Sequence, residues 1–412
     1  MRIASAHSHD ITIDTLQRRQ ADLSDLQTRL TSGKRVLKAS DDPAAAARAE
    51  RALAAEMRSD TSQRSVDASK VAMSQTESAL GDAGELLQQV REALVASGNA
   101  TYTDAERFQL GASLSSMRQQ LLGVANRSDG AGSYLFGGQG SSQPPFVDSP
   151  APAGVQFIGT SGQLRASSDT ALPLSTDGVA GWLSASTGNG VFVTQSATNS
   201  VNGAAVSGAW IDAGTVTTPS ALFPVTDTGY RVHFTSSSTY DIESYSLSSP
   251  ATPPTVESSG AYQSGKAIAV HGMAVTVTGT PTTGDQFSIA PSTPTLSVFD
   301  TIDAAISELR TAHCTPAQRA QSTADRLRDV DASMVSLGLA RSTVGGALNL
   351  IDNETSRLAD QKLIAQTERS DAEDLDMPQA LSEFQNQQTG YEAALKAYSM
   401  VQEMSLFQYI AG

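Results

Sequence analysis

The chain has 412 residues, of which 5% are aromatic, with a formal net charge of −15 and a pI near 4.7. A negative chain without clustered cations does not suit the phosphates of nucleic acid or an anionic membrane surface, so we expect neither as a partner. The length is enough for two or three domains, and the low aromatic content argues against a compact enzyme core.

One cysteine, Cys314, excludes an intrachain disulfide, so packing and assembly must stabilise the fold. The N-terminal residues contain no apolar stretch of about seven residues or more, and we therefore expect no Sec-type signal peptide. Because no stretch approaches the roughly 18 apolar residues of a membrane span, we also expect no membrane insertion.

Prolines separate a middle region from two helical arms. Thirteen of the 16 prolines lie between Pro144 and Pro294. The other three suit helix starts: Pro43 follows Asp42, Pro378 follows Asp376-Met377, and Pro316 lies within Thr315-Pro316-Ala317-Gln318, which has the spacing of a capping box. The sequence around Thr103 and Glu106 predicts another capped helix.

Apolar residues in the arms repeat at heptad spacing, which predicts a helical bundle or coiled coil made by the two ends of one chain. One C-terminal column contains Val330, Leu337, Val344, Ile351 and Leu358, and the other contains Leu327, Met334 and Leu348. Similar three–four spacing occurs nearer the two termini. We predict that these terminal residues form an assembly surface: Leu16, Leu23, Leu26, Leu30, Leu381, Phe384, Tyr391, Leu395, Tyr398, Met404 and Phe407.

The middle region is rich in Ser, Thr, Gly and Pro, and its short alternating runs predict strands at Tyr230–Phe234 and Ala274–Thr278. We therefore expect a mainly α chain with an inserted β domain. The expected domains are a terminal helical assembly domain (1–40 and 375–412), an inner helical bundle (41–140 and 296–374) and a surface-exposed β domain (141–295).

Enzyme and metal motifs are missing from the sequence. His7 and His9 have no second ligand cluster, and a solvated tail is the better interpretation, so we expect no metal and no cofactor. Cys314 beside His313 suits a passive helix end more than a nucleophile. Asp41 and Asp42 suit a helix start more than acid–base chemistry. We find no candidate catalytic residue and expect no enzyme.

Two segments resemble the N-terminal signature of flagellins and their junction relatives: Leu30–Val36 and Ala39–Ala44. The stretch from Arg357 to Asp376 and the terminal helix resemble that family's C-terminal pattern. The aromatic–glycine segment 132–139 is similar to the hook-associated branch. The residues that carry the resemblance are Ser32, Gly33, Lys34, Arg35, Ser40, Asp41, Asp42, Pro43, Tyr134, Leu135, Phe136 and Gly137.

This resemblance implies a structural, self-assembling flagellar subunit in a thin ring that connects hook to filament. Its implied partners are copies of itself, a hook-side junction protein, flagellin, and a cytoplasmic export chaperone on the C-terminal helix. It further implies an extracellular location, reached through type III export without a cleaved signal peptide. A filament flagellin is the alternative, and a secreted coiled-coil adhesin is a weaker one.

Overall fold

The computed structural model describes residues 2–149, 154–166, 170–223, 227–249 and 253–410, with side chains described between residues 10 and 401. The chain forms two compact units, residues 1–64 with 353–412, and residues 65–352. It is mainly helical with an inserted β domain, which confirms the predicted fold class.

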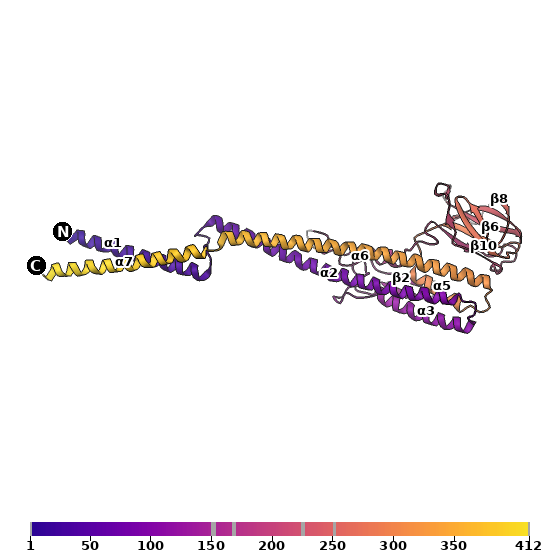
Figure 1. The fold of residues 1–412 in the computed structure, drawn as a ribbon, viewed down its shortest axis with the longest axis horizontal. Helices are drawn as coiled ribbons and strands as arrows, with labels where there is room; N and C mark the ends of the chain where they lie inside the picture. The colour runs from indigo at the N-terminus through magenta and orange to yellow at the C-terminus, as the bar shows by residue number, and fades with distance from the viewer. Residues whose placement is uncertain (1, 150–153, 167–169, 224–226, 250–252, 411–412) are drawn as a thin grey trace. The chain divides into compact units, whose positions relative to one another are not determined.

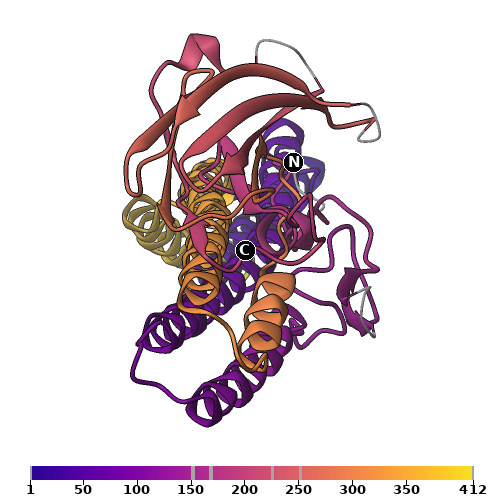
Figure 2. The same ribbon diagram turned by 90° about the vertical axis from the view of Figure 1, so that its right-hand side faces the viewer.

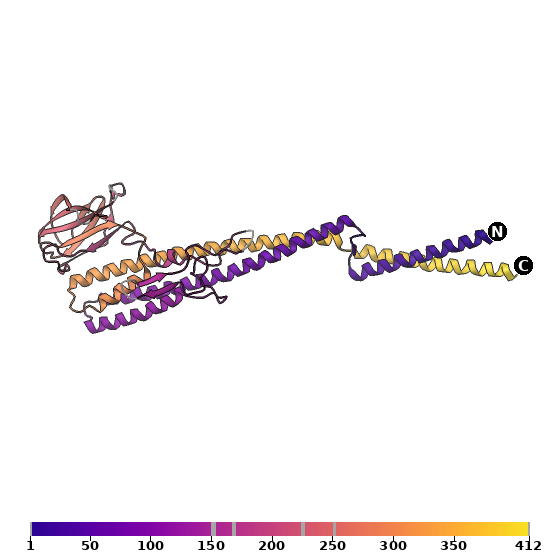
Figure 3. The same ribbon diagram turned by 180° about the vertical axis from the view of Figure 1, so that it is seen from behind.

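The first unit contains the two terminal helices, α1 (Arg2–Ser32) and α7 (Met377–Ile410). They lie side by side, indigo and yellow in Figures 1 and 3. The unit also contains the beginning of α2 (Pro43–Ser97) and the end of α6 (Pro316–Glu373). Asp42 caps α2 by accepting from the N–H groups of Ala44 and Ala45, as expected for a helix start.

The predicted heptad column on α6 is buried along its whole length. Its members in the second unit are at most 3% exposed, and in the first unit Leu358 is likewise 3% exposed. A matching column on α2 repeats every seven residues, with Ala45 and Ala52 in the first unit; in the second unit it contains Val66, Met73, Leu80, Leu87 and Leu94. These columns confirm the coiled-coil interpretation of the inner arms.

Ion pairs show that α2 and α6 run antiparallel. In the second unit they join Lys70 to Asp352 (2.8 Å), Glu77 to Arg341 (2.5 Å) and Arg91 to Asp331 (2.7 Å). Exposed ion pairs of this kind add little stability. Because each pair fits only one alignment of the helices, their effect is to favour a single register.

Among the residues described, the second unit also contains the shorter helices α3 (Asp104–Ala125), α4 (Gly178–Trp182) and α5 (Val298–Leu309), and a 3₁₀ helix, η1 (Pro219–Ala221). The predicted capping box at Thr103 and Glu106 is present. Thr315 and Gln318 likewise exchange side-chain-to-backbone hydrogen bonds at the start of α6, which confirms the second predicted box. The helices α3 and α5 pack against each other.

The β domain is built from two antiparallel sheets and a separate hairpin. The larger sheet has the order β3-β11-β6-β7-β8, and the smaller places β4, β5 and β9 on β10. Figure 2 shows the curvature of the larger sheet. The strands are β1 (Phe146–Ser149), β2 (Gly154–Phe157), β3 (Phe192–Ser196), β4 (Ala209–Ile211), β5 (Thr215–Val216), β6 (Thr228–Ser236), β7 (Thr239–Ser246), β8 (Thr255–Ala261), β9 (Ala267–Val270), β10 (Met273–Gly279) and β11 (Gln286–Pro291).

Alternation along these strands creates the core of the β domain. Tyr230, Val232 and Phe234 of β6 point to the same buried side, and they share one apolar cluster with Val275 and Val277 of β10. The cluster therefore joins the two sheets face to face. Both predicted strands are confirmed, since Tyr230–Phe234 lies in β6 and Ala274–Thr278 lies in β10.

By length and composition alone, α6 is one helix among the described residues that could cross a membrane. Core helices of soluble proteins pass the same test. In the second unit, Leu337 and Val344 of α6 are buried in the protein, and Arg341 between them bonds Glu77. We therefore assign α6 to the helical body.

Replacing Leu337 by Ala tests the buried column. Leu337 is 3% exposed, and its removal should lower the free energy of unfolding by about 2–5 kcal/mol. Leu339, two residues further along the same helix, is 67% exposed and provides the matched control, with an expected change within about 0.5 kcal/mol. Urea denaturation followed by circular dichroism measures both, and equal losses would contradict the assignment of the core face.

Candidate functional site

The terminal helix pair brings together most of the residues predicted for assembly. Leu16, Leu23, Leu26 and Leu30 of α1 are half-buried, as are Phe384, Tyr391 and Tyr398 of α7. The two helices pack against each other, and the guanidinium of Arg19 lies close to Gly390, where an added Cβ would meet Nη1 at 2.9 Å. These side chains therefore form the seam between α1 and α7.

Two predicted residues lie outside this seam. Leu381 is 52% exposed and Leu395 is 42% exposed. They are 14 residues apart, two heptads, so they occupy the same side of α7. Met377, four residues before Leu381, is 48% exposed and extends the same side. We call Met377, Leu381 and Leu395 the open flank of α7. The side chains of Met404 and Phe407 lie outside the described residues.

The signature residues of the N-terminal arm lie between α1 and α2, in residues 33–42, beside residues 374–376, which connect α6 to α7. We call these two connecting segments the joint. Helix α1 ends at Ser32, and Gly33 follows with φ +69°, a left-handed conformation that glycine adopts without strain. The N–H of Gly33 bonds the carbonyl of Arg29, and the carbonyl of Gly33 accepts from the N–H of Leu375 in the other arm. The break after α1 is thus tied to the break before α7.

Arg35 makes the widest set of contacts in this joint. Its N–H donates to the carbonyl of Glu373 (2.7 Å), and its guanidinium donates to the carbonyl of Ala372 (2.8 Å). The guanidinium also pairs with Asp42 at 3.3 Å. Since Ala372 and Glu373 end α6, Arg35 satisfies carbonyls that have no partner within the helix. The same side chain therefore links the end of α6 to the start of α2.

The acidic signature residues hold the turn between α1 and α2. Asp41 accepts from the N–H groups of Leu37 and Lys38, and these bonds, the one from Lys38 first, lower the pKa of Asp41. The N–H of Ala45, and then the side chain of Arg35, lower the pKa of Asp42. Asp42 therefore caps the start of α2, as predicted, whereas Asp41 bonds residues that precede it and holds the turn instead of the helix start.

Sequence reasoning missed the acidic and basic residues that flank the joint on α2 and α6. Glu373 pairs with Lys34 at 3.1 Å and with Arg369 at 3.0 Å. Arg369 also pairs with Glu56 at 2.8 Å, and Lys362 pairs with Asp60 at 2.7 Å. The four-residue spacing of Arg369 and Glu373 was visible in the sequence, whereas their partners on other helices were not.

The aromatic–glycine segment lies in the second unit and serves packing. Phe136 is 2% exposed and meets Trp182 edge-on, with ring centroids 5.3 Å apart. Trp182 stacks on Phe299 of α5 at 6.0 Å and also contacts Phe146 of β1. Leu135 and Gly137 are buried and Tyr134 is half-buried, and the N–H of Gly137 bonds the carbonyl of Tyr134 in the same turn. The segment thus anchors the chain where it leaves α3.

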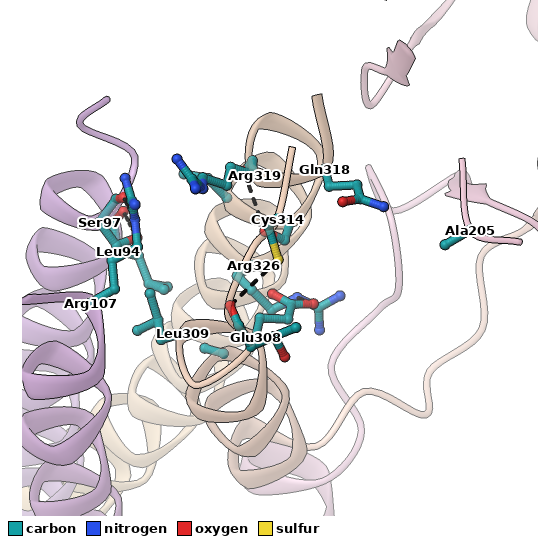
Figure 4. A pocket seen from close by; sticks show the side chains of 14 residues that line it. Leu94, Ser97, Arg107, Ala205, Glu308, Leu309, Cys314, Gln318, Arg319 and Arg326 are labelled. Atoms are coloured by element: carbon teal, nitrogen blue, oxygen red, sulfur yellow. Dashed lines mark hydrogen bonds and ion pairs between the residues drawn. The ribbon is translucent and has the colours of Figure 1, made fainter. Parts of the chain in front are cut away.

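A pocket of the second unit, of about 330 Å³, lies between α2, α5 and α6 (Figure 4). Cys314 and Arg319 line it, together with Glu308 and Arg326, which form an ion pair at 3.5 Å. Burial raises the pKa of Glu308, and Arg326 also pairs with Asp329 at 3.3 Å. The carboxylates and guanidinium groups neutralise one another, and we interpret the pocket as a structural charge network.

Within the described residues, no three His, Cys, Asp or Glu side chains gather in a group that could hold a metal ion. The side chains of His7 and His9 lie outside the described residues. Cys314 is a half-buried free thiol whose sulfur lies 3.6 Å from the carbonyl of Thr311.

Replacing Arg35 by Ala tests the joint. The variant removes the guanidinium bond to the carbonyl of Ala372 and the pair with Asp42, whereas the backbone bond to the carbonyl of Glu373 remains, and we expect local stability to fall by about 1–3 kcal/mol. Hydrogen–deuterium exchange should accelerate in residues 33–42 and 373–377 and stay unchanged in the β domain. Arg51→Ala is the control, because Arg51 is exposed and bonds only the carbonyl of Ala47 in its own helix among the contacts described. Equal exchange rates of residues 33–42 and 373–377 in the two variants would contradict the proposed role of Arg35 in connecting the two arms.

The comparisons with known proteins agree with this arrangement. Residues 3–141 match the bacterial flagellin N-terminal helical region, and residues 327–410 match the bacterial flagellin C-terminal helical region. A segment of 150 residues, 35% of this chain, is 32% identical to flagellar hook-associated protein 3 of Salmonella typhimurium and covers 46% of it. The protein of the same name from Escherichia coli is 30% identical over 152 residues, which cover 36% of this chain and 47% of that protein. The chain thus matches about half the length of these curated relatives.

Solved structures resemble the chain over a longer stretch. FlgL of Xanthomonas campestris is 26% identical with a TM-score of 0.67, and the match covers 78% of this chain and 99% of that one. The flagellar junction protein FlgL from Legionella pneumophila is 25% identical with a TM-score of 0.60, covering 71% of this chain and 95% of that one. The two matched flagellin regions together span more than half of the sequence and contain both terminal helices and the joint. This chain therefore belongs to the flagellin family.

Proposed function

We propose that this protein is a hook-associated junction subunit of the bacterial flagellum, which connects the hook to the filament and supports flagellin polymerisation through its terminal helices. The observation that supports this most strongly is the similarity to solved junction proteins over nearly their whole length. The anchoring of Phe136 and Leu135 favours the same branch, because the aromatic–glycine segment resembles that branch in sequence. The role proposed for the subunit in the flagellum is structural.

The proposed partners are other copies of the subunit in a ring, a hook-side junction protein and flagellin. The open flank of α7 supports this, since Met377, Leu381 and Leu395 are apolar and exposed in a single chain. Before assembly, a cytoplasmic export chaperone would cover the same helix. Export would use the flagellar type III route without a cleaved signal peptide, and the mature subunit would lie in the extracellular flagellum.

A filament flagellin remains the alternative, because it would have the same terminal helices. Negative-stain electron microscopy of concentrated purified protein separates the two: a flagellin forms long filaments, and a junction subunit does not. Fluorescent labelling of an introduced surface cysteine on assembled flagella should then give one spot at the hook end. Label along the whole filament would replace the junction proposal by the flagellin one. A secreted adhesin would give neither pattern.

We further propose that the sheets of the β domain are dispensable for assembly and lie on the outer surface. Ala185 and Leu296 exchange two backbone hydrogen bonds, at 3.0 and 2.9 Å, so the chain enters and leaves the sheets at neighbouring points. Deleting residues 187–294 and inserting two glycines should therefore spare the aromatic cluster around Trp182 and Phe299. The expected result is an exported subunit that still supports filaments. A soluble, exported variant that never supports them would assign the sheets an axial role.

Replacing Leu395 by Asp tests the open flank. Burying a carboxylate against a partner costs several kcal/mol, whereas Leu395 is 42% exposed in the single chain. We therefore expect a monomer whose thermal unfolding midpoint shifts little, and cells that release flagellin into the medium from hooks without filaments.

Asn386→Asp is the control for this variant, because it adds the same charge to an exposed position on another face of α7. Cells that carry it should swim normally. Normal motility with Leu395→Asp at wild-type protein levels would show that the open flank is not an assembly surface.

A further inference from the structure

The solvent-side face of the larger sheet carries a buried carboxylate that the proposed function does not use. Glu243 of β7 is 5% exposed, although it lies on the side of the sheet away from the apolar core. It accepts from Nε of Arg231 at 2.5 Å, and its second oxygen lies 3.1 Å from Nδ1 of His233. Arg231 and His233 alternate on β6 and therefore share this face.

A serine lies on the other side of the same imidazole. Oγ of Ser200 is 3.2 Å from Nε2 of His233 and 3.1 Å from the carbonyl oxygen of Gly284, so two acceptors lie within reach of its one proton. The serine belongs to a loop that its neighbour Asn199 holds in place: the side chain of Asn199 donates to the carbonyl of Thr283 and to Oδ1 of Asp285, and it accepts from the N–H of Val201. Ser200 is exposed, whereas the groups that position it are buried or half-buried.

These contacts determine the tautomer of the imidazole. A carboxylate cannot donate, so the Nδ1 atom of His233 must carry the proton that Glu243 accepts. The Nε2 atom of a neutral imidazole is then an acceptor and faces the hydroxyl of Ser200. A nucleophile, a base and a carboxylate that orients the base thus stand in the order that activates serine hydroxyls in hydrolases on unrelated folds.

We propose that Ser200 is an activated nucleophile that accepts an acyl group from an activated ester, with His233 as its base and Glu243 as a positioning residue. Oγ of Ser200 forms a bond to the acyl carbon while its proton moves to Nε2 of His233. The bond from the acyl carbon to the leaving oxygen then breaks, and that oxygen takes the proton from His233. The products are an O-acyl serine and an alcohol or phenol, so the step is balanced without a further reactant.

The backbone around Ser200 limits this chemistry. The N–H of Ser200 bonds the carbonyl of Gly284, and the N–H groups of Val201 and Asn202 bond Oδ1 of Asn199. The N–H groups next to the nucleophile are therefore occupied and do not form an oxyanion hole. We accordingly assign reactivity toward activated esters and phosphonofluoridates, with slow release of the acyl group, and no peptide hydrolysis.

Active-site-directed labelling of the full chain tests this proposal. A biotinylated fluorophosphonate forms a phosphorus–oxygen bond with an activated serine as the phosphorus–fluorine bond breaks, and the serine proton leaves with fluoride. Chymotryptic cleavage after Phe192 and Trp210 would release residues 193–210, in which mass spectrometry locates the label on Ser200. Ser200→Ala should remove the label, whereas Ser238→Ala, at an exposed serine of the same domain without a histidine contact in the structure, should leave it unchanged.

Two further variants distinguish activation of the Ser200 hydroxyl by His233 from a purely structural role of these side chains. His233→Gln should lower the labelling rate about a hundredfold. Glu243→Gln should also lower the labelling rate and should alter its dependence on pH. Circular dichroism verifies that each variant is folded. The proposal would be overturned if Ser200 were labelled no faster than Ser238 in the wild-type chain. It would also be overturned if Ser200 were labelled at the same rate in folded His233→Gln as in the wild-type chain.

Discussion

The burial of one apolar column on α6, repeated every seven residues, is the constraint on which the helical part of this protein depends. A column at this spacing keeps facing its partner only when the two helices wind around each other, and α2 supplies a partner of matching pattern in each unit. Toward the joint the column becomes alanine, with Ala45 and Ala52 on α2 and Ala365 and Ala372 on α6. Small side chains let two helices approach closely. The helices α2 and α6 therefore have a defined register where they meet the joint. Arg35 depends on this register, because it bonds the carbonyls of Ala372 and Glu373 at the end of α6.

Local signals in the sequence predicted local structure well. The caps at Asp42, Thr103 and Thr315 were predictable because a capping side chain and its backbone partner lie within three residues of each other. The α6 column was predictable for a similar reason, since seven-residue spacing expresses the geometry of a single helix. The contacts of Arg35 were not predictable, because its guanidinium bonds a carbonyl 337 positions away and only the pairing of the arms brings the two together.

The terminal helix shows the same limit at a finer scale. Leu381, Phe384, Tyr391, Leu395 and Tyr398 follow one three–four pattern, yet Phe384, Tyr391 and Tyr398 lie in the seam and the two leucines do not. Residues at such spacing cover more than a quarter of the helix circumference, which is wider than the contact with one neighbouring helix. The sequence indicates that a face is apolar. Which part of it the chain's own helix occupies depends on the direction from which α1 approaches.

A chemical grouping can escape sequence reasoning for the same physical reason. Ser200, His233 and Glu243 follow no motif spacing. The antiparallel pairing of β6 with β7 places Arg231 opposite Glu243, and the loop held by Asn199 brings Ser200 to the far nitrogen of the imidazole. A sheet that alternates core and solvent faces concentrates polar side chains of distant sequence on one surface. When such a surface also buries a carboxylate, the hydrogen bond of the carboxylate fixes the tautomer of a neighbouring histidine. A sheet that is stabilised by its packing can in this way position reactive side chains.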